Sequence, residues 1–138
     1  MNSGDVPIVR SIVAVGAGFF AVTVLSAAAD VAFTQMAPNA FDASGLARAD
    51  SALFVKLAYE TVFALIAGYV TARIAIRRPF LHAGAMAALA LAGRALVAVG
   101  EWDVRPGWFI AGILLLIFPA ALLGAKLSLW NRESPSSR

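Results

Sequence analysis

The sequence contains no cysteine and a single histidine, His82. The absence of cysteine excludes disulfides, thiol redox chemistry and zinc–thiolate sites. One histidine is too few for a typical transition-metal centre. Charged residues make up only 14% of the chain, against about 25% in soluble globular proteins. We therefore expect no metal site and no cofactor.

Several functional motifs are also missing. The sequence has no glycine-rich phosphate loop, no nucleophile elbow and no H-E-x-x-H pattern, which gives an enzymatic function little support. The net charge is +3 and the isoelectric point is near 10.0. No basic, aromatic-rich polar segment accompanies this charge, so we expect no nucleic-acid partner.

What the chain has in abundance is apolar residues. Of its 138 residues, 61% are hydrophobic, and the mean hydropathy is +0.82. A soluble domain of this size has too little interior to hide so much apolar surface. The composition predicts an integral membrane protein whose remaining apolar surface is covered by the lipid bilayer.

Four segments are long enough to cross the hydrocarbon core, which takes about 20 mostly apolar residues. Each should be a helix, because backbone groups in lipid must be satisfied within the segment. The links after the second and third segments are short, which favours antiparallel neighbours. The sequence predicts an all-α, four-helix transmembrane bundle forming one domain, with helices at about residues 8–29, 52–76, 80–100 and 106–127 and a polar tail at 128–138.

Basic residues determine the expected orientation, because they collect at the cytoplasmic ends of membrane helices. With both termini in the cytoplasm, only Arg48 and Arg105 lie outside, and Lys56 and Arg94 lie within helices. The remaining seven of the eleven basic residues are then cytoplasmic: Arg10, Arg73, Arg77, Arg78, Lys126, Arg132 and Arg138. We predict a cytoplasmic N-terminus and a cytoplasmic C-terminus.

An alternative interpretation of the first segment is a cleaved signal peptide. Ala27, Ala28 and Ala29 fit an A-x-A cleavage site after an apolar run. The run is longer than an ordinary signal-peptide core and its leader is barely basic, which favours a retained helix.

Three charged residues fall inside the predicted helices: Lys56 and Glu60 in the second and Arg94 in the third. At 1.5 Å per residue, Glu60 lies about 3 Å and Arg94 about 6 Å to the outer side of the midplane. Lys56 lies one turn from Glu60 on the same face. An isolated charge at such depth is costly, so the three side chains are predicted to form one polar cluster.

Small residues four apart indicate helix faces that pack closely. Glu60 continues such a stripe on the second helix, with Ala64, Gly68 and Ala72, and Arg94 continues one on the third, with Ala83, Ala87 and Ala90. We therefore expect the second and third helices to touch along these stripes.

Two roles are open for the polar cluster. It can be a buried ion pair that fixes the register of the helices, which we favour, or the lining of a pocket that binds protons, a cation or an anionic headgroup. Asp30 is expected to be solvated at the outer end of the first helix rather than paired with Lys56. Arg73, Arg77 and Arg78 are candidate contacts for anionic lipid headgroups, although such clusters are more often only a topology signal.

The stretch YETVFALIAGYVTARIAIRRPFLHA resembles a pattern found in several uncharacterised bacterial families of small four-helix inner-membrane proteins. The resemblance implies a multi-pass protein of the bacterial inner membrane and brings no assigned activity. The matching residues are Tyr59, Gly68, Tyr69, Ala72, Arg73, Pro79, His82 and Ala83.

The leading hypothesis for function is a non-enzymatic scaffold or accessory subunit, with a homo-oligomer or another membrane protein as possible partner. The alternative is a small transporter or channel that uses Glu60 and Arg94. A lipid-modifying enzyme is the weakest hypothesis, since only the polar cluster can serve as its site.

Overall fold

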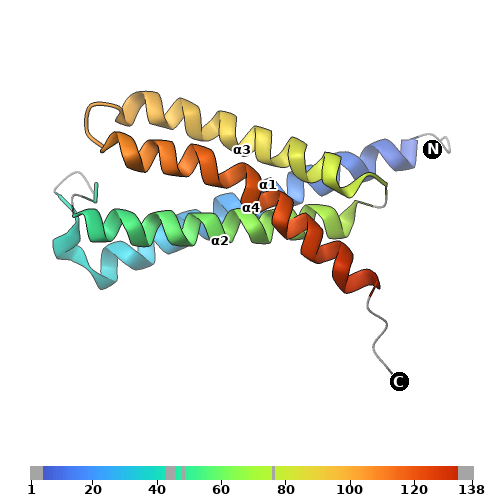
Figure 1. Cartoon of the computed structure of the whole chain (residues 1–138), viewed down its shortest axis with the longest axis horizontal. Coiled ribbons are helices and arrows are strands. Elements are labelled where there is room, and N and C mark those ends of the chain that lie inside the picture. The colour runs from blue at the N-terminus through green and yellow to red at the C-terminus, as the bar shows by residue number, and fades with distance from the viewer. Residues whose placement is uncertain (1–4, 43–45, 48, 76, 134–138) are drawn as a thin grey trace, which may run out of the picture.

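The computed structural model describes residues 5–42, 46, 47, 49–75 and 77–133, which form a bundle of long helices (Figure 1). Each of its four α-helices is long and apolar enough to cross a membrane, so the predicted all-α class is confirmed. The elements are α1 (Asp5–Met36), the short 3-10 helix η1 (Pro38–Ala40), α2 (Asp50–Ile74), α3 (Pro79–Glu101) and α4 (Gly107–Glu133).

Two helices are longer than the sequence predicts. Helix α1 continues seven residues beyond Ala29 and ends at Met36, just before Pro38, whose ring disfavours further helix. Helix α4 runs to Glu133, well into the segment interpreted as a polar tail. Polar residues such as Gln, Lys and Arg also form helices readily. The start of a polar segment therefore predicts the ends of α1 and α4 too early.

Helix α2 is the central element and packs most extensively against α4. At Gly68 the two helices approach so closely that an added Cβ would lie 2.6 Å from the carbonyl carbon of Ala121. Gly124 makes the reciprocal approach, where a Cβ would lie 2.8 Å from the carbonyl carbon of Leu65. Only glycine permits this backbone contact at either position.

The expected contact between small residues of α2 and α3 is present, but it is only part of the packing. Helix α3 does contribute Ala83 and Ala87 to buried clusters with α2, but α4 shares both clusters through Ala125 and Ala121. Gly68 itself faces α4. Residue spacing identifies which face of a helix is small, but it does not identify the helix that packs there.

Helix α1 crosses α2 at a second close contact. A Cβ added to Gly18 would lie 2.9 Å from the carbonyl oxygen of Ala67 and would also clash with the Thr71 hydroxyl. Met86 of α3 also lies beside Gly18, so α1 and α3 are close at this point. From there the two helices diverge, and their C-terminal ends lie far apart (Figure 1).

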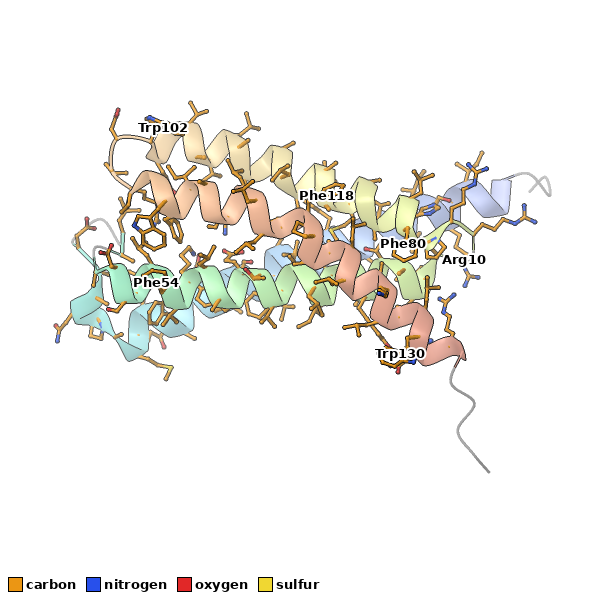
Figure 2. All side chains as sticks on the ribbon, viewed as in Figure 1. Arg10, Phe54, Phe80, Trp102, Phe118 and Trp130 are labelled. Carbon is orange, nitrogen blue, oxygen red and sulfur yellow. The ribbon has the colours of Figure 1, made fainter. Side chains whose placement is uncertain are left out.

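The outer faces of the helices carry large exposed apolar side chains. Phe20 is 69% exposed, Leu96 78% and Leu115 73%. Trp102 and Trp130 lie at opposite ends of the bundle, and Arg10 lies at the Trp130 end (Figure 2). Such a surface suits an apolar solvent bounded by two interfaces.

Candidate functional site

Glu60 is the centre of a polar cluster midway along α2, and its side chain is only 5% exposed. Its Oε1 atom pairs with the guanidinium of Arg94 from α3 and lies 3.6 Å from the ammonium of Lys56. Its Oε2 atom accepts a hydrogen bond of 2.9 Å from the Ser26 hydroxyl of α1. Both carboxylate oxygens are therefore satisfied, as burial requires.

Lys56 lies one turn before Glu60 and is directed toward α1. Its ammonium pairs with Asp30 Oδ1 and donates to the Tyr59 hydroxyl at 3.2 Å. That hydroxyl in turn donates to Asp30 Oδ1. One carboxylate oxygen thus receives two hydrogen bonds from α2.

The expectation that Asp30 is solvated and unpaired is wrong. Because α1 continues to Met36, Asp30 lies within the helix, one turn after Ser26 and on the same face, which is turned toward α2. The Asp30 side chain keeps 46% of its surface exposed while it pairs with Lys56. Ser26 is the site residue that sequence reasoning missed, and Asp30 is the one whose pairing it misjudged. Their four-residue spacing was the available signal.

Asp30, Lys56, Glu60 and Arg94 together form what we call the polar quartet. The structure brings together the three residues predicted to cluster and adds Asp30. Its two acids and two bases balance in charge, and they join α1, α2 and α3. This arrangement can hold three helices in register without leaving an unpaired charge.

A pocket of about 340 Å³ lies beside the polar quartet, with walls from all four helices. Its walls are mainly apolar, and its polar lining comes from Thr23, Ser26, Asp30, Glu60 and Arg94. A concave apolar site with a few convergent polar groups, in the range of about 300–1,000 Å³, is typical of small-molecule binding. The apolar walls include Phe19, Val22, Met86, Val97 and Ile117.

The predicted basic cluster lies at the other end of α2, in its last turn and in the short link to α3. Arg73, Arg77 and Arg78 are exposed, and Arg78 adopts a left-handed conformation (φ 50°) just before Pro79 starts α3. Contact of these three side chains with lipid headgroups stays a prediction.

Two other arginines cap the last turn of α2. Arg10 donates to the carbonyl oxygen of Ile74 at 3.0 Å. Arg132 donates to the carbonyl oxygens of Ala72 at 3.0 Å and Arg73 at 2.5 Å. The last carbonyls of a helix have no partner within it, so these side chains satisfy the end of α2 and tie α1 and α4 to it.

Within the described part of the chain, no three histidine, aspartate or glutamate side chains gather closely enough to hold a metal ion. Comparison with known proteins finds no family model that matches the chain, and no curated protein and no solved structure similar to it.

Proposed function

We propose that the chain crosses the bacterial inner membrane four times, with both ends in the cytoplasm. The lengths of the four helices, their exposed apolar faces and the tryptophans at both ends of the bundle support this placement. Arg10 and Arg132 lie together at the end of α2, which agrees with a cytoplasmic position for that end.

In this membrane the protein acts as a non-enzymatic accessory subunit that binds an apolar membrane component in the pocket beside the polar quartet. The observation that carries this proposal is the contrast between the two parts of the site. The charges pair with one another across three helices, while the adjacent pocket is open, apolar and large enough for a small molecule. Paired charges favour a structural role, and an apolar pocket with a few polar groups favours non-covalent binding.

The test is to extract the protein from native membranes in mild detergent and to identify retained small molecules by native mass spectrometry. The proposal expects about one apolar molecule per chain, as for a single pocket. Gly93 lines the pocket, and a Cβ added there meets no atom within 4 Å. Gly93→Leu should therefore fill the pocket without harming the fold and should lose the molecule. Equal retention by both proteins would contradict the proposal.

A small transporter is the second candidate, because the carboxylates of Glu60 and Asp30 both line the pocket. A proton or cation site would use an acid at this position. Purified protein in vesicles, loaded with a pH-sensitive dye, distinguishes the two functions. An accessory subunit gives no flux above empty vesicles, whereas a transporter gives flux that Glu60→Gln abolishes.

A further inference from the structure

Among the described residues that line the pocket, Arg94 has hydrogen-bond donors that are not used. A guanidinium carries five N–H donors. The structure pairs Arg94 with Glu60 and gives its remaining N–H groups no acceptor among the described residues. The side chain is 25% exposed, and it lines the pocket. A ligand that offers an oxygen acceptor would satisfy these donors.

The charge balance of the polar quartet limits what this ligand can be. Lys56 pairs with Asp30 and Arg94 pairs with Glu60, so no net charge is left to attract an ion. A cationic or anionic head would bring an uncompensated charge into a mostly apolar pocket, which is unfavourable. An uncharged head avoids this cost.

Glu60 offers nothing further to a ligand. Its two oxygens already accept from Arg94 and Ser26, with Lys56 at 3.6 Å, and its side chain is 5% exposed. Donors from a ligand would have to displace these contacts. The unused hydrogen-bond donors in this part of the lining are those of Arg94, and they require an acceptor on the ligand.

We propose that the pocket binds an uncharged, apolar molecule whose carbonyl oxygen accepts a hydrogen bond from Arg94, with the remainder of the molecule against Phe19, Val22, Met86 and Val97. This inference rests on the proposed function and adds the chemical class of the ligand. Two sources supply this chemistry in a membrane: the ester carbonyl of an uncharged lipid and the carbonyl of a quinone.

The test measures equilibrium binding of four labelled probes to the full chain in nanodiscs, with empty nanodiscs subtracted. The carbonyl probes are dioctanoylglycerol and decylubiquinone, and the charged probes are decylammonium and decanoate. At least one carbonyl probe should bind saturably, and both charged probes at least about tenfold more weakly, equivalent to about 1.4 kcal/mol. The carbonyl probe that binds more tightly identifies the source.

Variants of α3 locate the binding site. Gly93→Leu should abolish binding because the new side chain occupies the pocket. Gly100→Leu is the matched control, since it lies two turns along α3, outside the pocket lining, and its Cβ also meets no atom within 4 Å. Arg94→Lys keeps the charge that pairs with Glu60 but loses the planar set of donors, so carbonyl probes should bind about tenfold more weakly.

The outcomes separate the ligand class from the proposed function. Tighter binding of a charged probe, or wild-type affinity for carbonyl probes in Arg94→Lys, would overturn the ligand class alone. In that case the loss of binding in Gly93→Leu would still support a binding pocket. No saturable binding of any of the four probes would also overturn the ligand class. The proposed function is overturned separately, if Gly93→Leu extracted from native membranes retains as much small molecule as the wild type. A melting temperature measured for every variant shows that each protein is folded.

Discussion

A double-mutant cycle on Glu60 and Arg94 tests whether the polar quartet is structural. Glu60→Gln leaves Arg94 without its carboxylate partner, and the described residues offer the guanidinium no other acceptor. Removal of one member of a buried ion pair costs about 3–5 kcal/mol. Because the Arg94 side chain is 25% exposed, we expect the lower end, about 3 kcal/mol.

Arg94→Gln should cost less than Glu60→Gln. Without Arg94, Glu60 keeps the Ser26 hydrogen bond of 2.9 Å and the Lys56 ammonium at 3.6 Å. The buried carboxylate then still has partial compensation, and we expect a loss of about 2 kcal/mol. The double variant carries two uncharged amides that can bond to each other, so it should recover a coupling energy of about 1–3 kcal/mol.

The assay is unfolding by sodium dodecyl sulfate in mixed micelles, followed by circular dichroism, for the wild type, both single variants and the double variant. Direct contact predicts a coupling energy above about 0.5 kcal/mol. Additive losses, with a coupling energy near zero, would refute the ion pair as a structural element. Full stability of Glu60→Gln would favour the transporter, since glutamine resembles the protonated acid.

Two further predictions concern the packing and the capping of α2. Gly68→Leu should lower stability by at least about 3 kcal/mol, because its side chain must push the backbone of Ala121 away, whereas Gly16→Leu, with open space at its Cβ, should have little effect in the same unfolding assay. Arg132→Gln should lower stability by about 1–2 kcal/mol by freeing two carbonyls at the end of α2, while Lys126→Gln, at an exposed site on the same helix, should not.

The sequence was sufficient to predict the four helices and the meeting of Glu60 with Arg94. Apolar runs of about 20 residues have few other outcomes. Because the link at Pro79 is short, α2 ends and α3 begins at nearly the same depth. Residue counts along each helix from this link then place Glu60 and Arg94 level with each other. Depth along a helix axis is a one-dimensional quantity, and residue spacing gives it directly.

The direction in which each helix face points, and the helix that packs against it, could not be predicted in the same way. Asp30 looked like the end of a helix because it follows an apolar run, yet α1 continues and directs it to Lys56. The small-residue stripe predicts that Gly68 packs against α3, but it packs against α4. Small residues occur on several helices, and only the three-dimensional arrangement decides which two helices pack together. The capping of α2 by Arg10 depends on contacts between residues 64 positions apart.

Reporter fusions test the proposed topology of four spans with both ends in the cytoplasm. Alkaline phosphatase and a fluorescent protein, active on opposite sides of the inner membrane, are fused in turn after Asp42, Arg78, Asp103 and Arg138. Four spans with cytoplasmic ends predict a cytoplasmic signal after Arg78 and Arg138 and an external signal after Asp42 and Asp103. A cytoplasmic signal after Asp42 would contradict this topology and the depth argument for the polar quartet.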